Sequence, residues 1–188
     1  MSERITKHIK QHIDTIQLLA ESSHLIETIS QSITRCLKEN GKILWMGNGG
    51  SAADCQHMAA EFVGRFEQER KGLASIALTT DTSILTSVGN DYGFEQIFSR
   101  QIESLCNKND IVIGISTSGN SKNIVEGLKK AQQIDAYTIG FTGNDGGLMA
   151  TQVDTCIIVP SSNTARIQEA HILIGHIICA CVEMDYFG

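Results

Sequence analysis

The sequence predicts an α/β protein: a three-layer αβα sandwich with a central parallel sheet, preceded by two N-terminal helices. Short apolar runs of strand length alternate with longer segments of helical periodicity along most of the chain. Two of these runs, at 42–46 and 110–116, pass directly into a glycine- or serine-rich turn and then into a helix start. Strands that alternate with helices in this way form a parallel sheet covered by helices on both faces.

Two amphipathic helices are expected before the first strand. Isoleucines recur at spacings of three and four from Ile5 to Ile16, and the apolar pattern resumes from Leu25 to Ile33. Ser22 and Ser23 are the expected break and cap between the two helices. Because this pair lies outside the strand–helix alternation, we expect it to form a subunit interface. The alternative is that it covers one edge of the sheet.

The other elements follow from apolar runs and turn signals. Helices are expected at about 51–63, 82–88, 94–106, 121–134 and 164–185. Further strands are expected at 75–78, 137–142 and 155–159, and polar turns at 89–93 and 143–147. Ligands of such sheets bind at the carboxyl ends of the strands, where both glycine- or serine-rich turns fall.

Length and composition limit the class of protein. The chain of 188 residues is most simply one domain, with a helical pair at 1–40 and an α/β core at 41–188. Its formal net charge of −6 gives no global attraction to nucleic acid. The N-terminus lacks the apolar run of a signal peptide, and segment 170–182 is shorter than the ~20 residues of a membrane span. We expect a cytoplasmic protein whose six cysteines are reduced core residues.

The turn after the first strand has the composition of an anion site. Gly47, Gly49 and Gly50 allow positive φ and close backbone approach, and Ser51 suits the helix N-terminus. Unpaired N–H groups at such a turn attract anions. The alternative is a tight strand–helix connection with surface polar residues.

The second turn, at 116–121, offers four hydroxyls, one amide and the N–H groups of another helix start. It contains no Lys or Arg and lacks the GxxxxGK[ST] pattern of a nucleotide P-loop. Neutral donors and a helix dipole suit a phosphate monoester. An ordinary serine-rich capping turn is the alternative, but the pairing of two such turns favours phosphate binding.

His57, Glu61, Gln168 and His176 form a chemically reasonable ligand set for Zn²⁺ or a similar divalent ion. His57 and Glu61 lie about 40° apart on one helix. Gln168 and His176 are about 12 Å apart along a straight helix, whereas ligand atoms on one metal are roughly 3–4 Å apart. We therefore expect neighbouring subunits to share the site, or Gly175 to distort the helix. His171 is expected to be a packed or interface histidine.

Several motifs occur in an order that resembles the sugar isomerase (SIS) family and, within it, the phosphoheptose isomerases. The resemblance covers essentially the whole chain. The matching motifs are GNGGSAAD at 47–54, HMAAEFVGR at 57–65, VGNDYGF at 88–94, GISTSGNS at 114–121, FTGNDGG at 141–147 and RIQEAHILIGH at 166–176.

The resemblance implies a flavodoxin-like SIS fold and a cytoplasmic homotetramer with sites between subunits. It implies the conversion of sedoheptulose 7-phosphate to D-glycero-D-manno-heptose 7-phosphate through an enediol, the first step toward the nucleotide-activated heptose of lipopolysaccharide or capsule. It implies zinc on residues His57, Glu61, Gln168 and His176. Among these residues, Glu61 and His176 are the expected catalytic pair. The implied substrate contacts are Asn48, Gly49, Gly50, Glu61, Asn90, Asp91, Ser116, Thr117, Ser118, Ser121 and Gln168, with Ser51 and Arg65 as further candidates.

One departure and one rival stand beside this expectation. Ala165 occupies the position where some family members carry Asp, which puts in doubt a carboxylate role there. The rival is a non-catalytic SIS tetramer that binds the bacterial replication initiator. The local sequence Ala165–Glu169 resembles the corresponding segment of those SIS proteins. Such proteins are expected to lack the Glu and the second His that stand here at positions 61 and 176.

Overall fold

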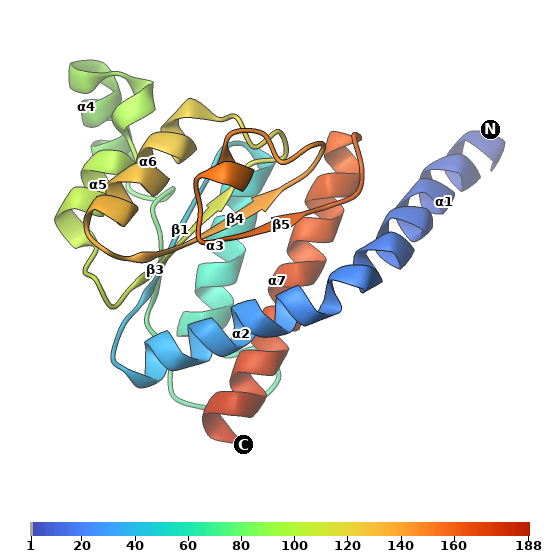
Figure 1. Cartoon of the computed structure of the whole chain (residues 1–188), viewed down its shortest axis with the longest axis horizontal. Helices are drawn as coiled ribbons and strands as arrows, with labels where there is room; N and C mark the ends of the chain where they lie inside the picture. The colour runs from blue at the N-terminus through green and yellow to red at the C-terminus, as the bar shows by residue number, and fades with distance from the viewer. Residues whose placement is uncertain (1) are drawn as a thin grey trace.

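The computed structural model describes residues 2–188 and contains one five-stranded parallel sheet (Figure 1). The strands lie in the order β2-β1-β3-β4-β5. Their bounds are Ile43–Gly47 for β1, Ser75–Ala77 for β2, Ile111–Ile115 for β3, Tyr137–Thr142 for β4 and Thr155–Ile158 for β5. Every predicted strand is present within one residue at each end. The predicted fold class is confirmed.

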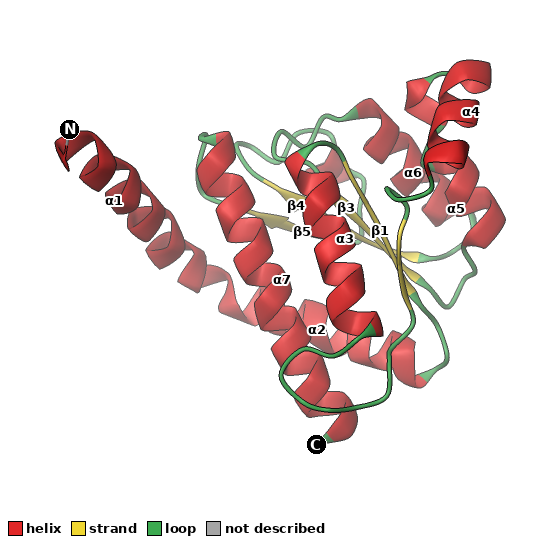
Figure 2. Cartoon of the chain, turned by 180° about the vertical axis from the view of Figure 1, so that it is seen from behind, coloured by secondary structure: helices red, strands yellow, loops and turns green. Residues whose placement is uncertain are grey.

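Helices cover both faces of the sheet, so the strands are buried on both sides. Helices α2 (Ser23–Lys38), α3 (Gly50–Val63) and α7 (Thr164–Phe187) cover one face (Figure 2). Helices α5 (Ser99–Leu105) and α6 (Lys122–Gln133) cover the other. Alternate side chains of each strand enter the two cores: Ile43 and Trp45 pack under α3, whereas Leu44 and Met46 pack under α6.

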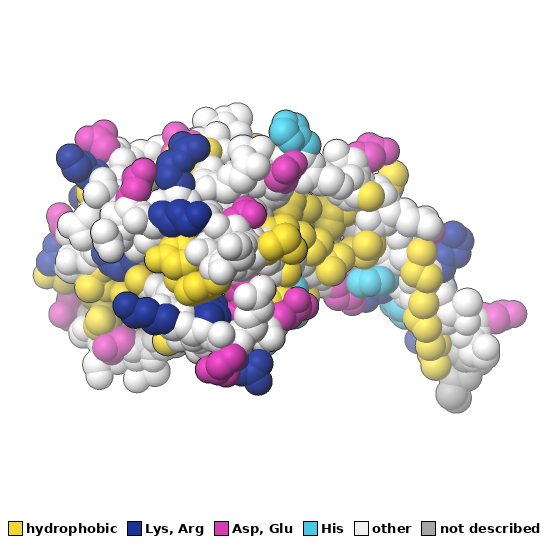
Figure 3. Space-filling view, turned by 90° about the horizontal axis from the view of Figure 1, so that it is seen from below, with side chains coloured by type: hydrophobic (Ala, Val, Ile, Leu, Met, Phe, Trp, Pro, Cys, Tyr) yellow, Lys and Arg dark blue, Asp and Glu magenta, His cyan; other side chains and the backbone are white. Residues whose placement is uncertain are grey.

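The N-terminal segment is more continuous than the sequence predicts. Helix α1 (Ser2–Leu19) passes through a 3₁₀ turn (Ala20–Ser22) directly into α2, and the Ser22 side chain makes no capping hydrogen bond. The predicted boundary at Ser22 and Ser23 is present as this 3₁₀ turn, but the turn joins the two helices into one path, and the predicted cap is wrong because Ser22 makes no capping hydrogen bond. Helix α1 projects from the body (Figure 1), and a line of hydrophobic side chains runs along it (Figure 3). These include Ile5, Ile9 and Ile13, which are 46–60% exposed.

The segment around 89–93 also differs from the prediction. Helix α4 (Thr82–Tyr92) starts with Asp81, which accepts a hydrogen bond from the Ile84 N–H at 2.9 Å, as the capping pattern predicts. It then continues through the expected turn and ends only at Gly93, whose φ is 91°. A 3₁₀ turn (Phe94–Gln96) separates it from α5, so the predicted helix at 94–106 is split. A further 3₁₀ turn (Met149–Thr151) follows β4.

Helix α7 has 24 residues and is long and apolar enough to cross a membrane. The expectation that this segment is too short to span a membrane is therefore wrong. However, α7 packs along α2 and α3, and its residues Ile167, Ile174 and Ile178 are fully buried in the core. It is the central helix of this layer. The cysteines are free, as expected, and burial raises the pKa of the Cys55 and Cys179 thiols.

His171 lies inside this core, as a packed histidine. Its Nε2 donates to the Thr142 carbonyl at 3.0 Å, and among residues 2–188 its Nδ1 has no hydrogen-bond partner. Burial lowers the pKa of His171 to about 4, partly opposed by the bond to Thr142. Protonation would place a second, unpaired N–H and a positive charge in an apolar environment, so the folded protein holds the neutral ring.

We predict that His171 makes the protein less stable in acid. Between pH 6.5 and about 4 the unfolded chain binds a proton at this position and the folded chain does not, so folding stability falls as the pH falls. Urea unfolding at pH 7.0 and 4.5, at equal protein concentration, measures the change. The wild type should lose about 2–3 kcal/mol more than His171→Gln, whose amide donates without titrating. Equal losses in the two proteins would contradict the prediction.

Candidate active site

An amide pair joins the two turns at the carboxyl edge of the sheet. Asn48 follows β1, and Asn123 lies in the first turn of α6. Asn48 Nδ2 donates to Asn123 Oδ1 at 2.9 Å, and Asn123 Nδ2 donates back to Asn48 Oδ1 at 2.8 Å. This reciprocal pair fixes the glycine turn beside the serine turn.

The serine turn presents a cluster of hydroxyls beside the N-terminus of α6. Ser116 Oγ lies 2.9 Å from Ser121 Oγ and 3.5 Å from Ser118 Oγ. Gly119 has φ +66°, and a Cβ there would lie 2.0 Å from the Gly146 carbonyl. The turn therefore requires glycine at this position, and it directs neutral donors to one place at a helix start. Such a group suits an anion that carries several acceptor oxygens.

In the glycine turn, only Gly49 uses a positive φ, of 55°. Gly47 and Gly50, expected to allow positive φ or close backbone approach, do not use positive φ, and steric contact explains why both are glycine. A Cβ on Gly47 would lie 2.6 Å from the Ser51 carbonyl oxygen. A Cβ on Gly50 would lie 2.4 Å from the Gln168 amide nitrogen. Gly50 thus allows the start of α3 to touch α7.

Asp54 orients the side chain of Gln168. The Gln168 amide donates to Asp54 Oδ1 at 3.4 Å, which directs the amide N–H group toward α3. Asp54 is buried, and its Oδ2 has no hydrogen-bond partner within 2–188. Burial raises the pKa of Asp54, while the Gln168 bond and the nearby His57 oppose the rise.

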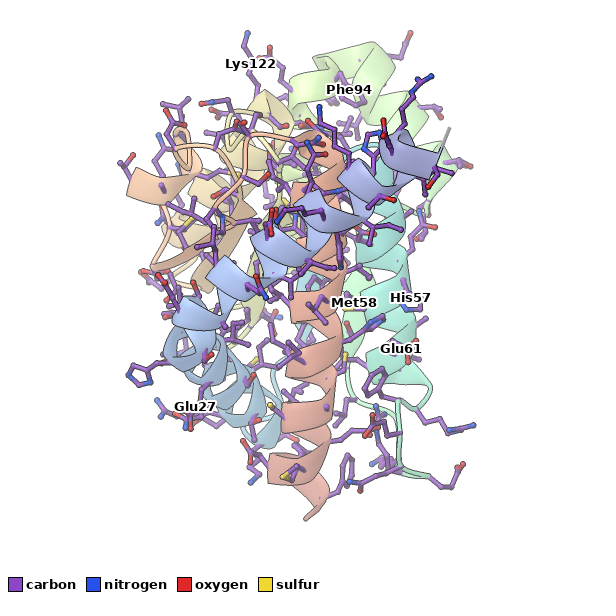
Figure 4. The ribbon with its side chains drawn as sticks, turned by 90° about the vertical axis from the view of Figure 1, so that its right-hand side faces the viewer. Glu27, His57, Met58, Glu61, Phe94 and Lys122 are labelled. Atoms are coloured by element: carbon purple, nitrogen blue, oxygen red, sulfur yellow. The ribbon has the colours of Figure 1, made fainter. Side chains whose placement is uncertain are left out.

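One helical turn further along α3, two histidines and a glutamate meet. His57 Nε2 lies 3.0 Å from His176 Nε2 and 3.3 Å from Glu61 Oε1. Figure 4 shows His57 and Glu61 on α3, beside α7. His57 is about half exposed, while the Glu61 side chain is 21% exposed. Two imidazoles and a carboxylate can exchange protons with a bound molecule at this surface.

Close helix packing brings these groups together. A Cβ on Gly175 would lie 2.2 Å from the Met58 sulfur, so Gly175 allows α3 and α7 to approach beside His176. Helix α7 is uninterrupted from Thr164 to Phe187, which excludes the predicted distortion at Gly175. Phe66, in the loop after α3, stacks on the His176 ring at 5.6 Å between centroids and 23° between planes.

The donor set fits a divalent ion only in part. The two short distances from His57 match the ~3–4 Å separation of ligands on one zinc ion. Gln168 bonds to Asp54 instead, two turns of α7 away from His176. Within the described residues, no group of three or more His, Cys, Asp or Glu side chains has the arrangement of a metal site. One chain thus places His176 and Glu61 each beside His57, and the fourth predicted ligand, Gln168, apart from them.

The remaining predicted substrate contacts are spread over different parts of the fold. Asn90 and Asp91 are exposed at the end of α4, where Asn90 donates to Asp91 at 2.8 Å. Arg65 is exposed beside Glu69, and no bond joins it to the histidines. Thr117 uses its carbonyl to accept from Asn144 at 3.0 Å.

Sequence reasoning did not identify Asp54, Phe66 or Asn123 as site residues. The spacing of three between Asp54 and His57 places both on one face of α3, which is a usable signal. Asn123 and Phe66 act through partners 75 and 110 positions away, which no local pattern reveals.

Comparison with known proteins identifies the family. The SIS domain family matches residues 7–143. Phosphoheptose isomerase 2 of Campylobacter jejuni is 53% identical over 99% of this chain and 96% of its own length. Phosphoheptose isomerase of Aquifex aeolicus is 51% identical over 97% of this chain and 96% of its own length. The solved structure of the Neisseria gonorrhoeae phosphoheptose isomerase matches with a TM-score of 0.93 and 44% identity, over 97% of this chain and 98% of that one. The chain therefore belongs to the SIS domain family and, within it, to the phosphoheptose isomerases.

Proposed function

We propose that this protein interconverts sedoheptulose 7-phosphate and D-glycero-D-manno-heptose 7-phosphate in the cytoplasm, as an aldose–ketose isomerase. The observation that carries the proposal is the contact of His57 with Glu61 and His176. His57 and Glu61 lie on α3, which begins at the glycine turn, and His176 lies on the adjacent helix α7. Full-length relatives named as phosphoheptose isomerases support it. They do not favour the rival role as a partner of the replication initiator.

Substrate binding follows from the two turns. The hydroxyls of Ser116, Ser118 and Ser121 donate to the phosphate, together with the first N–H groups of α6. Asn48, Gly49 and Gly50 position the sugar hydroxyls, because the two glycines beside Asn48 are exposed and free of side-chain bulk. The phosphate thereby fixes one end of the sugar and leaves the other end for the acid–base groups.

Isomerisation moves a proton between C1 and C2 through an enediol. It needs a base near the carbon and an acid near the oxygens. Glu61 is the proposed base, since its carboxylate is largely shielded from water and lies next to the histidines. His176 is the proposed acid–base partner, which shuttles the proton of the adjacent hydroxyl.

A zinc ion held by His57, Glu61, His176 and Gln168 would polarise the carbonyl and stabilise the developing negative charge when it is bound. Because Gln168 lies apart from the other three in one chain, we propose that neighbouring subunits share the site. The exposed isoleucines along α1 support association through this helix, and the homotetramer is the proposed assembly.

We predict that Glu61→Gln and His176→Gln each lower kcat by about 10²–10⁴-fold, because each removes a positioned proton-transfer group. NMR of product formation from sedoheptulose 7-phosphate measures the rate. The matched control is Glu27→Gln, an exposed carboxylate on α2 (66% of the side chain, Figure 4) that should leave the rate unchanged. Near-wild-type turnover by Glu61→Gln would exclude it as the base.

The serine turn gives a separate prediction. Ser121→Ala removes the partner of Ser116 and one phosphate donor, so KM should rise about tenfold with little change in kcat, as expected for loss of ground-state binding. Ser104→Ala, which removes an exposed hydroxyl on α5, is the control. A fall in kcat at unchanged KM would place Ser121 in the chemical step instead.

Metal content tests the shared site. His57→Ala and Gln168→Ala should each lower bound zinc per chain, measured by elemental analysis, and a chelator should remove wild-type activity until zinc is restored. The two inactive variants, unfolded together and refolded as mixed oligomers, should recover part of both zinc and activity. Each variant then supplies the ligand that the other lacks. No recovery in verified mixed oligomers would show that one chain provides all four ligands.

A further inference from the structure

The loop after α3 folds around a buried ion pair that the proposed mechanism does not use. Arg70 lies in this loop, and Glu183 lies near the end of α7. Arg70 Nε donates to Glu183 Oε1 at 2.8 Å, and the two side chains are only 3% and 2% exposed. A buried pair of this kind is costly to desolvate, so its remaining hydrogen bonds decide what it contributes.

The Glu183 carboxylate binds the backbone of the loop. It accepts hydrogen bonds from three consecutive N–H groups, those of Phe66, Glu67 and Gln68, at 2.9, 2.9 and 3.0 Å. Together with Arg70, these donors satisfy both carboxylate oxygens. The position of the Phe66 backbone is therefore set by a side chain of α7.

The Arg70 guanidinium binds the other side of the same loop. It donates to the carbonyls of Glu61 at 2.8 Å, Phe62 at 2.7 Å and Gly64 at 3.1 Å. The last carbonyls of a helix have no partner within the helix, and here Arg70 supplies one. These hydrogen bonds from Arg70 therefore hold the terminal turn of α3, which carries Glu61.

Phe66 transmits this arrangement to His176. Its N–H is held by Glu183, and its ring stacks on the imidazole with 5.6 Å between centroids. His176 lies seven residues before Glu183 on α7, two turns along the same side of the helix. The pair therefore contacts the backbone of one proposed catalytic residue and, through Phe66, the ring of the other.

We propose that Arg70 and Glu183 are positioning residues for the reaction: they hold the loop so that Phe66 fixes the His176 ring while Arg70 fixes the end of α3 at Glu61. This inference rests on the proposed function, because that function makes Glu61 and His176 the reacting groups. The pair touches no substrate. It acts only through the loop.

A matched ion pair elsewhere in the fold separates positioning from stability. Asp110, 3% exposed, binds Lys42 Nζ at 2.6 Å and the N–H groups of Lys42 and Asn107 at 2.9 and 2.7 Å. It is also a buried carboxylate with one cation and several backbone donors. However, it lies at the amino end of the sheet, away from the histidines.

The test compares Glu183→Gln with Asp110→Asn in the full-length protein. Histidine labelled with ¹³C at Cε1 gives at most six ring signals, and His176→Gln identifies the one from His176. Glu183→Gln should shift the His176 signal in the same direction as Phe66→Leu, which removes the stacked ring directly. Asp110→Asn should leave it in place. A His176 signal unchanged in Glu183→Gln would overturn the proposal.

Kinetics provide the second measurement. Phe66→Leu and Glu183→Gln should lower kcat by about tenfold to a hundredfold, the usual effect of a small misplacement, with KM changed far less because the serine turn is intact. Phe66→Tyr retains a stacking ring and should restore both kcat and the His176 signal. If Glu183→Gln does not fold, Arg70→Lys takes its place. This variant keeps the positive charge but loses the planar set of guanidinium N–H donors.

The two measurements fail independently. If the wild type does not isomerise the sugar phosphate, the proposed function is wrong, while the His176 signal still reports whether the pair positions the ring. If Asp110→Asn lowers kcat and shifts His176 as much as Glu183→Gln does, both pairs act through general stability and the positioning role is excluded.

Discussion

The close contact between α3 and α7 is the constraint on which the site depends. Gly50 on α3 and Gly175 on α7 have no room for a Cβ, since each lies against a side chain of the opposite helix. These two glycines let the helices approach along their length. This approach brings His57 Nε2 within 3.0 Å of His176 Nε2, while the His57 side chain stays about half exposed. A methyl group added at either glycine would force a shift of the Gln168 or Met58 side chain that it meets.

The parallel sheet supplies the second part of the site. Its strands are apolar on both faces, so polar groups gather where the strands end. The Asn48–Asn123 pair shows how these ends are arranged, because each amide donates one N–H to the other and accepts one in return. The phosphate-sized group of hydroxyls and the exposed glycine backbone are thus held in a fixed relation before any ligand binds.

Local pattern predicted the elements well and their contacts poorly. The strand at 111–115 is a continuous apolar run, so the local sequence is enough to set its bounds. Residues 89–92 carry turn-forming types but remain helical, because Asp81 caps α4 and Gly93 provides its end. The helix ends, the glycine contacts and the ion pair of Arg70 with Glu183 depend on partners far along the chain. The periodicity of a sequence gives no information about contacts between residues that are far apart in the chain.

Two features of the single chain point to the same conclusion about assembly. The apolar side of α1 is exposed, and the proposed ligand set lacks Gln168 at the histidines. Both features meet at the start of α7, where Arg166 donates to the His8 carbonyl at 2.7 Å and Glu169 lies 2.7 Å from His12. Gln168 lies between these two residues in the sequence, while its side-chain amide faces Asp54 on α3. Association through α1 would therefore bring a second copy beside the turn of α7 that carries the missing ligand, so covering the apolar surface and completing the site would be one event.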